Sequence, residues 1–438
     1  MRHLITFCAT LMLALPTLAS AELSQRENRA VYGADDRLDY YEVEDATIRA
    51  IGVESAAVVM SAYAIDSSDP QNLRFRANTL GEAARLCSTE NFRAQTLASF
   101  CSAVLIDSDL ILTAGHCVWD AEGQCPNLRF VFDMHLTDAS QSSPQGVTID
   151  DVYSCRQVVA REQSAGSGGT KDWAVIQLDR PVDEQRRAAA LRRGHSAVAQ
   201  DASLLMVGGP NGLPMKWDAG GRVRDPRASN LDTFKSTVDA FGGNSGSGVW
   251  VRESNQWKLA GILVSGDQDY VQDGTCNRVN QCGATGCAGE NIVYLQRALD
   301  DLCLYAKGSA ICQSAAECGD GFCAPSEDHN SCPRDCEPVT CGDGYCHVDE
   351  WDSCAADCVR NVPQGWTCKA WEYGSFDGCD TTCGVSDPDC DLKDASGSLG
   401  DLFNCQSATP GAYALMVGGI FALLGGLALR ARRRQDRA

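Results

Sequence analysis

The middle of the chain alternates short apolar runs with polar turns. Residues 103–106 and 110–112 are apolar and flank the polar residues 107–109, a pattern that predicts a β-hairpin. Two more runs of strand length, mostly apolar, follow at 173–178 and 248–251. We therefore expect β-strands at these four places, separated by turns and loops.

A longer apolar segment lies near the beginning of the sequence. Residues 4–18 are mostly apolar, Arg2 places a positive charge before them, and Ala19-Ser20-Ala21 follows. This order predicts a secretory signal peptide over residues 1–21. Residues 22–30 are then a candidate short propeptide.

A second long apolar segment lies near the other end. The uncharged run 412–429 is 18 residues long, and an arginine cluster follows it at 430–434. Eighteen residues at helical rise just span a bilayer core of roughly 30 Å. We expect a transmembrane helix at 411–429, a basic cytoplasmic tail at 430–438 and a Ser- and Gly-rich linker at 393–410. The alternative is a buried core helix.

Charge and cysteine content narrow the class of protein. The formal net charge of −21 argues against a nucleic-acid partner. An exported chain enters an oxidising compartment, so its 24 cysteines predict disulfides rather than metal thiolates. Ten of them lie between residues 87 and 312 and twelve between 318 and 390, while Cys8 and Cys405 stand apart.

The twelve later cysteines form a repeat. Cys318-Gly-Asp-Gly-Phe-Cys323 returns as Cys341-Gly-Asp-Gly-Tyr-Cys346, a period of 23 residues from first cysteine to first cysteine. A third, divergent unit runs over 368–390. Units this small cannot bury a core, so disulfides are expected to hold the cysteine-rich region 313–392 together.

Each of the first two repeats carries acidic residues at matching positions. Oxygen ligands on a tight loop suit calcium, which makes these residues candidate ligands for a structural Ca²⁺. The alternative is that the acids only solubilise a cysteine-dense loop. The six positions are Asp320, Glu327, Asp335, Asp343, Glu350 and Asp357.

Three strings carry the chemistry of a nucleophilic enzyme. Thr113-Ala-Gly-His116-Cys117 places a histidine just after the predicted hairpin, Asp172 enters an apolar strand, and Ser245 sits in Gly243-Asn-Ser245-Gly-Ser247. They supply a base, a carboxylate that orients it, and a hydroxyl nucleophile. The order His, Asp, Ser separates them from α/β-hydrolases and subtilisins.

Each string also has an ordinary structural explanation. The histidine can be a hydrogen-bonded structural residue, Asp172 a strand-edge carboxylate, and the glycine-rich serine turn a plain loop. Asp179 competes with Asp172, but it opens the turn before Pro181 and looks solvated. The three strings together, in this order, favour catalysis. The glycines let the N–H groups of Gly243 and Ser245 converge as an oxyanion hole.

Cys101 and Cys117 bracket the predicted hairpin. A disulfide between them would close a loop worth about 3 kcal/mol in the chain-entropy model.

Residues 31–306 resemble the chymotrypsin-like serine peptidases. The resemblance implies an all-β fold of two packed antiparallel β-barrels over a protease domain at 31–312, with His116, Asp172 and Ser245 as catalytic residues. Asn244, the string Val31-Tyr-Gly-Ala-Asp-Asp-Arg37 and residues 209–216 resemble the bacterial glutamyl-endopeptidase-like branch.

The resemblance leaves substrate specificity open. Asp239 stands six residues before Ser245, where trypsins keep the carboxylate that binds Lys or Arg, but Phe241 replaces the cysteine that staples their pocket. A structural or exposed Asp239 is the alternative. Residues 261–266 resemble the strand that pairs with substrate, and Ser265 and Gly266 leave the pocket mouth open. The glutamyl-endopeptidase branch instead suggests an acidic preference.

Asn244 bears on activation. In trypsin-type activation, cleavage frees a new N-terminal amine that forms an ion pair with an acidic residue at this position. Asn244 carries no charge, so we do not expect this activation mechanism here.

The other parts of the chain also resemble known modules. The cysteine repeats are similar to Cys-Gly-Asp-Gly-x-Cys modules of secreted bacterial proteins. Cys405 followed by an apolar helix and arginines resembles the MYXO-CTERM type of sorting tail, in which the helix is removed and the cysteine carries a new anchor.

The sequence therefore predicts an exported, surface-anchored serine endopeptidase that works through an acyl-enzyme and needs no cofactor for catalysis. Its partners would be a protein or peptide substrate and the membrane, reached through the helix or a processed anchor. The alternatives are a catalytically weak surface-binding protein that acts through its repeats, and an esterase that uses the same triad.

Overall fold

The computed structural model describes most of the predicted protease domain. The described residues are 30–313, with gaps at 76–77, 119–123, 166–169, 230, 284–285 and 307–308, together with 332–333, 365–368 and 382–385. The predicted signal peptide, the six candidate calcium ligands, Cys405 and the predicted transmembrane segment lie outside them. Within the described part, no helix is both long and apolar enough to cross a membrane.

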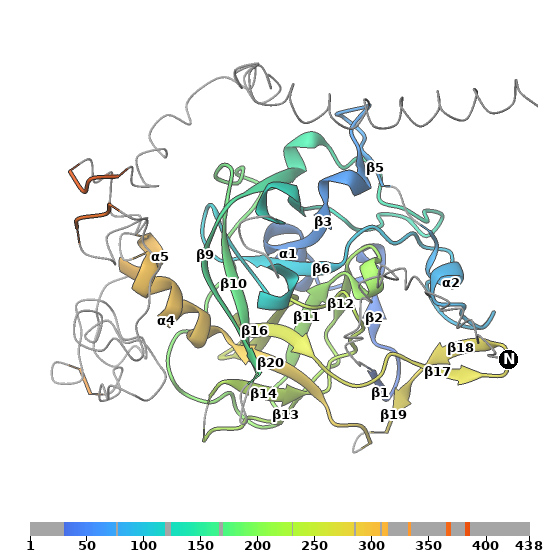
Figure 1. Cartoon of the computed structure of the whole chain (residues 1–438). Coiled ribbons are helices and arrows are strands. Elements are labelled where there is room, and N and C mark those ends of the chain that lie inside the picture. Colours follow the sequence, from blue (N-terminus) through green and yellow to red (C-terminus); the bar gives the residue numbers. More distant parts are fainter. Residues whose placement is uncertain are drawn as a thin grey trace, which may run out of the picture. The chain divides into compact units, whose positions relative to one another are not determined.

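The first half of the described chain forms a closed six-stranded barrel in the order β10-β7-β6-β3-β8-β9 (Figure 1). Its strands are β3 Ala56–Ser61, β6 Cys101–Leu105, β7 Leu110–Thr113, β8 Leu128–Val131, β9 Val152–Ala165 and β10 Thr170–Leu178. The β6–β7 hairpin confirms the first sequence prediction, with Val104 opposite Leu112. Both strands are buried along their whole length, which is why apolar residues fill them without alternation.

The second half forms an eight-stranded sheet in the order β13-β14-β20-β16-β15-β11-β12-β2. Its strands are β2 Arg37–Leu38, β11 Leu204–Gly208, β12 Lys216–Asp218, β13 Val223–Asp225, β14 Thr233–Ser236, β15 Gly248–Glu253, β16 Gln256–Ser265 and β20 Glu290–Tyr294. A bridge between Ser203 and Arg222 joins β11 to β13, and so brings the sheet round towards closure. The described chain is mostly β with few helices, as predicted.

Shorter elements surround the two sheets. The two-stranded pairs are β1 Val31–Tyr32 with β19 Gln281–Cys282, β4 Ile65–Asp66 with β5 Arg74–Phe75, and β17 Tyr270–Asp273 with β18 Cys276–Val279. The helices are α1 Ala46–Ser55, α2 Leu80–Ala83, α4 Leu295–Tyr305 and α5 Ala310–Gln313. Figure 1 shows α4 beside β9 and β10, on the opposite side of the domain from the β17–β18 hairpin.

Helix α1 is fixed by its first residue and by one glycine. Asp45 caps its N-terminus by accepting from the backbone of Thr47 and Ile48. Gly52 lies against the buried ring of Trp217, where a β-carbon would come within 2.4 Å of the indole. Since Trp217 belongs to β12, this close approach packs α1 against the second sheet.

Disulfides account for every cysteine between residues 30 and 313. The five pairs are Cys87–Cys276, Cys101–Cys117, Cys125–Cys155, Cys282–Cys287 and Cys303–Cys312. The predicted Cys101–Cys117 bridge is confirmed, and so is the disulfide interpretation for this region. In the divergent third repeat, Cys368 pairs with Cys383.

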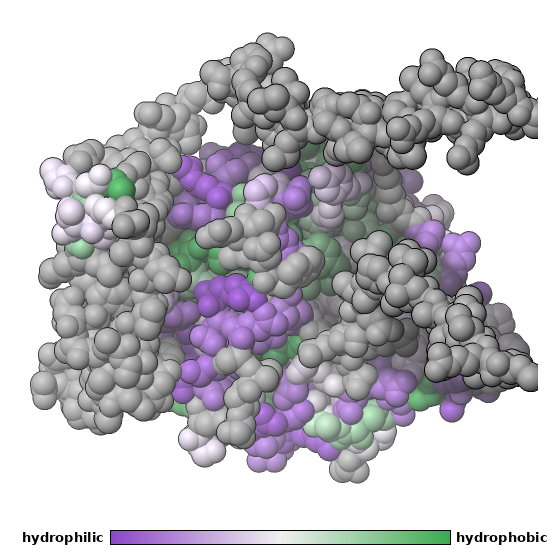
Figure 2. All heavy atoms as spheres, viewed as in Figure 1, coloured by the Kyte–Doolittle hydropathy of each residue, from purple (hydrophilic) through white to green (hydrophobic). Residues whose placement is uncertain are grey.

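The described part of the face drawn in Figure 2 is largely polar. Figure 2 shows hydrophilic side chains spread over the described part of this face, with smaller hydrophobic areas between them. The large hydrophobic side chains that are exposed among the described residues are Leu38, Tyr63 and Phe100.

Candidate active site

His116 lies on a single 3₁₀ turn, η3 Gly115–Val118, directly after β7. Gly115 passes so close to β9 that a β-carbon there would be 2.2 Å from the carbonyl oxygen of Glu162. Only glycine fits, which explains the residue before the histidine. The Cys101–Cys117 disulfide holds the other end of the turn against the start of β6.

Asp172, the third residue of β10, contacts His116 through both of its carboxylate oxygens. Its Oδ2 lies 2.6 Å from the imidazole Nδ1, and its Oδ1 accepts a 2.8 Å hydrogen bond from the backbone N–H of His116. Because a carboxylate only accepts here, Nδ1 carries the proton, and the Nε2 of the neutral ring is left as the basic nitrogen. The carboxylate is 7% exposed, so water competes little for it.

Ser245 sits at the tip of a sharp turn that two glycines make feasible. Gly243 and Gly246 adopt φ angles of 87° and 84°, a region that favours glycine. A β-carbon on Gly246 would also lie 2.1 Å from the carbonyl oxygen of Ser102. The side chain of Asn244 closes the turn internally, because its Oδ1 accepts from Phe241 N at 3.0 Å and its Nδ2 donates to Ser247 Oγ at 3.1 Å.

The amide hydrogens of this turn suit an oxyanion. Within the described part of the chain, the N–H of Gly243 donates no hydrogen bond to the protein. The N–H groups of its neighbours Gly242 and Asn244 are used, by Asp269 Oδ2 and by the carbonyl of Phe241. Gly243 therefore keeps a backbone donor beside Ser245.

Ser102 of β6 connects the two halves of the site. Its N–H donates to the carbonyl of Ser245 at 2.7 Å, and its Oγ donates to the carbonyl of Gly243 at 2.9 Å. The same Oγ accepts from the N–H of Gly209 at 2.9 Å. Sequence reasoning missed this residue, since no local motif marks a serine inside an apolar strand.

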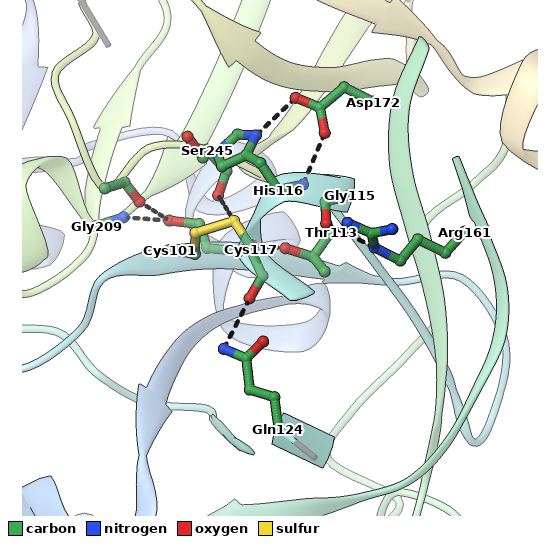
Figure 3. The surroundings of a disulfide bond; sticks show 12 residues. Cys101, Thr113, Gly115, His116, Cys117, Gln124, Arg161, Asp172, Gly209 and Ser245 are labelled. Atoms are coloured by element: carbon green, nitrogen blue, oxygen red, sulfur yellow. Dashed lines mark hydrogen bonds and ion pairs between the residues drawn. A yellow bond between two sulfur atoms is a disulfide. The ribbon is translucent and has the colours of Figure 1, made fainter. Parts of the chain in front are cut away.

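Figure 3 shows the imidazole of His116 between the carboxylate of Asp172 and Ser245. The carbonyl oxygen of Ser245 lies 3.8 Å from the Sγ of Cys117, which places the serine beside the histidine turn. The three residues predicted from separate strings therefore meet where the two sheets face each other. A cluster with the spacing of metal ligands is formed by Cys101, His116 and Cys117. Both cysteines are bonded to each other in the disulfide, so neither offers a thiolate to a metal.

Asp239 has a structural position. It is 2% exposed, its Oδ1 accepts from Tyr32 N at 2.7 Å, and its Oδ2 accepts from Asp36 N at 2.8 Å. Of the two explanations that the sequence left open, these contacts support the structural one. The carboxylate holds the segment before β2 against the second sheet.

Ser265 and Gly266 lie at the end of β16, next to the nucleophile turn. The turn hydrogen bonds to this strand through Gly246 N to Leu263 O at 2.8 Å and Leu263 N to Ser247 O at 3.0 Å. Ser265 Oγ accepts from the side chain of Asn291 at 3.0 Å. The predicted substrate-pairing strand is therefore adjacent to Ser245.

Parts of this chain are similar to known proteins. Residues 84–282 match the family model described as Trypsin. A "Trypsin-like protease" of Streptomyces glaucescens is 22% identical over 240 residues, which cover 50% of this chain and 84% of that protein. A solved Glu endopeptidase in complex with MPD is 18% identical, with a TM-score of 0.34 over 60% of this chain and 94% of that one.

The matched region contains the strings around His116, Asp172 and Ser245. Over residues 84–282 the chain is therefore similar to a trypsin-like serine peptidase domain, and the protein is a serine endopeptidase, a hydrolase of peptide bonds.

Proposed function

We propose that the protein cleaves peptide bonds through His116, Asp172 and Ser245, by way of an acyl-enzyme. The observation that carries this proposal is the double contact of Asp172 with His116, at 2.6 Å and 2.8 Å, next to the glycine turn of Ser245. That contact fixes the imidazole in the tautomer that can take a proton from a serine hydroxyl.

The steps balance without a cofactor. His116 Nε2 accepts the proton of Ser245 Oγ while the oxygen attacks the peptide carbonyl carbon. The resulting oxyanion accepts hydrogen bonds from the N–H groups of Gly243 and Ser245. The imidazolium then protonates the leaving amine as the C–N bond breaks. Water, deprotonated by the same imidazole, hydrolyses the ester and restores Ser245.

An exported location is part of the proposal. The five disulfides between residues 87 and 312 support it, because such bonds persist in oxidising compartments. Anchoring to the cell surface through the apolar segment at 411–429 rests on its composition and on the arginines that follow.

The test is covalent labelling of the full chain with a fluorophosphonate probe. We expect stoichiometric labelling of the native protein and no labelling of Ser245→Ala. The control is Ser68→Ala, in an exposed turn distant from Ser245 in the sequence, which should be labelled like the native protein. A folded native protein that is not labelled, or labelling that survives Ser245→Ala, contradicts the proposal. Hydrolysis of peptide substrates then separates a peptidase from an esterase.

A further inference from the structure

The peptide group that carries one proposed oxyanion donor lies between two glycines. It joins the carbonyl of Gly242 to the N–H of Gly243, and we call it the oxyanion peptide. Neither glycine has a β-carbon, so local steric contacts do not decide which way this peptide faces. If it rotated by half a turn, the carbonyl oxygen of Gly242 would replace the N–H of Gly243 and would repel an oxyanion.

A backbone N–H from another loop fixes the orientation of the oxyanion peptide. The carbonyl of Gly242 accepts a hydrogen bond from the N–H of Asn211. In a planar trans peptide the C=O and the N–H point in opposite directions, so this bond directs the N–H of Gly243 away from Asn211. The two loops are in close contact, since a β-carbon on Gly243 would lie 2.8 Å from the carbonyl oxygen of Gly209.

Asn211 is itself held in an uncommon backbone conformation. Its φ of 53° and ψ of 15° lie in the left-handed region, which asparagine tolerates better than most residues. Its side-chain Nδ2 donates to Asp269 Oδ2 at 3.2 Å, and its Oδ1 accepts from the hydroxyl of Tyr270. Burial, with the charge of Asp269, raises the pKa of Tyr270, so the phenol keeps the proton that it donates.

Asp269 also binds the oxyanion peptide directly. The oxygen that accepts from Asn211 accepts a second hydrogen bond from the N–H of Gly242 at 3.1 Å. Both backbone polar groups of Gly242 therefore lead to Asp269, one directly and the other through Asn211. Asp269 precedes β17, and the next residue, Tyr270, packs its ring 5.4 Å from that of Phe241. The β17–β18 hairpin thus supports the turn from outside.

We infer that Asn211, Asp269 and Tyr270 form a clamp that orients the oxyanion peptide, which makes them positioning residues for the reaction. The inference rests on the proposed function, because the clamp matters for catalysis only if Gly243 stabilises an oxyanion. None of the three side chains takes part in bond making or proton transfer. The clamp acts on the transition state, in which the oxyanion is formed, far more than on substrate binding.

Steady-state kinetics of Asp269→Ala test the clamp. On a peptide p-nitroanilide chosen by scanning the cleaved residue, we expect kcat to fall about 100-fold with KM nearly unchanged, the usual effect of losing one oxyanion donor. Asp269→Asn should recover most of the activity, because its amide oxygen can accept the same two hydrogen bonds. Asp273→Ala, exposed on the same hairpin, is the matched control. An unchanged kcat in Asp269→Ala overturns the inference.

An inhibitor that forms an oxyanion distinguishes positioning from general damage to the site. The aldehyde of the same peptide adds to Ser245 and presents its oxygen to the oxyanion donors. Asp269→Ala should weaken aldehyde inhibition by about the factor lost in kcat/KM. The Kd of the uncleaved peptide, measured by calorimetry on Ser245→Ala, should not change when Asp269→Ala is added. A matching loss of peptide affinity would show a merely structural role and overturn the inference.

Asn211→Gly keeps the test decisive if Asp269→Ala folds poorly. Glycine adopts the same left-handed backbone and keeps its N–H for Gly242, but it offers no side chain to Asp269 and Tyr270. We expect kcat to fall about 10-fold, again with little change in KM. A folded native protein that neither cleaves peptides nor is labelled by the fluorophosphonate refutes the triad. An active native protein whose kcat is unchanged by Asn211→Gly refutes the clamp and leaves the triad standing.

Discussion

At the scale of single residues, the site depends on a few side chains whose contacts cross from one sheet to the other. Asp172 and His116 belong to the first barrel, and Ser245 belongs to a loop of the second sheet. Ser102 is the residue of the first barrel that hydrogen bonds to the turn on both sides of Asn244, at Gly243 and Ser245. The alignment of nucleophile and base therefore depends on a serine that performs no chemistry.

Replacing Ser102 with Ala tests this dependence. The N–H bond to Ser245 remains, but the Oγ contacts with Gly243 and Gly209 are lost. We expect kcat to fall about 10- to 100-fold with little change in KM, because a small misplacement of a reacting group is costly. Steady-state kinetics on a peptide substrate measure it. Ser108→Ala in the β6–β7 turn is the control, and an unchanged kcat would contradict the interpretation.

The sequence allowed His116 and the Cys101–Cys117 bridge to be predicted because their determinants are local strings. A glycine that must touch β9 and a cysteine at each end of a hairpin leave a signature within a few residues. Ser102 leaves none. Its contacts with Gly243 and Ser245 depend on which segments become neighbours in the fold, so no string in the sequence marks it.

At the scale of elements, two buried aspartates fix the first described segment to the second sheet. Asp239 N donates to Asp218 Oδ2 at 2.6 Å, while the Asp239 carboxylate holds Tyr32 and Asp36. Burial raises the pKa of Asp218 to about 6, and burial together with the charge of Asp218 raises the pKa of Asp239 to about 8. The two raised pKa values mean that the pair retains a proton near neutral pH.

This pair predicts a pH dependence of stability. Between about pH 5 and pH 8 the folded state holds at least one proton that the unfolded state has released, and nearly two at the lower end. The pair's contribution to the free energy of unfolding therefore falls as pH rises. Above about pH 8 both states are ionised and the contribution stops changing.

Urea denaturation at a series of pH values measures the effect. The native protein should lose stability relative to Asp239→Asn between pH 5 and pH 8, by at most about 1.4 kcal/mol per pH unit. Asp69→Asn, in an exposed turn, should track the native protein. Parallel curves for the native protein and Asp239→Asn would show that the pair holds no such proton.

At the scale of the whole molecule, one disulfide joins segments that are far apart in the chain. Cys87 follows α2, and Cys276 opens β18 of the hairpin beside the nucleophile turn, at a sequence separation of 189 residues. The hairpin also reaches the turn itself, since the ring of Tyr270 packs 5.4 Å from that of Phe241. The bridge therefore ties a loop of the first half to the wall of the active site.

Removing this disulfide should lower the free energy of unfolding more than removing a disulfide that closes a short loop. In the chain-entropy model a 189-residue loop is worth about 5 kcal/mol, whereas the five-residue Cys282–Cys287 loop is worth about 2 kcal/mol. We expect the double variant Cys87→Ser, Cys276→Ser to lower the denaturation midpoint well beyond Cys282→Ser, Cys287→Ser. Equal midpoints would contradict the expectation.

The pairing of β1 with β19 has a consequence for the order of events during synthesis. Val31 is opposite Gln281, and Arg37 of β2 is opposite Asp218. The strands of the six-stranded barrel all lie between residues 56 and 178, so that barrel can form before the later residues have been synthesised. The segment 31–38 must wait for partners that emerge much later. We therefore expect peptidase activity, which also needs Ser245, to arise only after most of the domain has been synthesised.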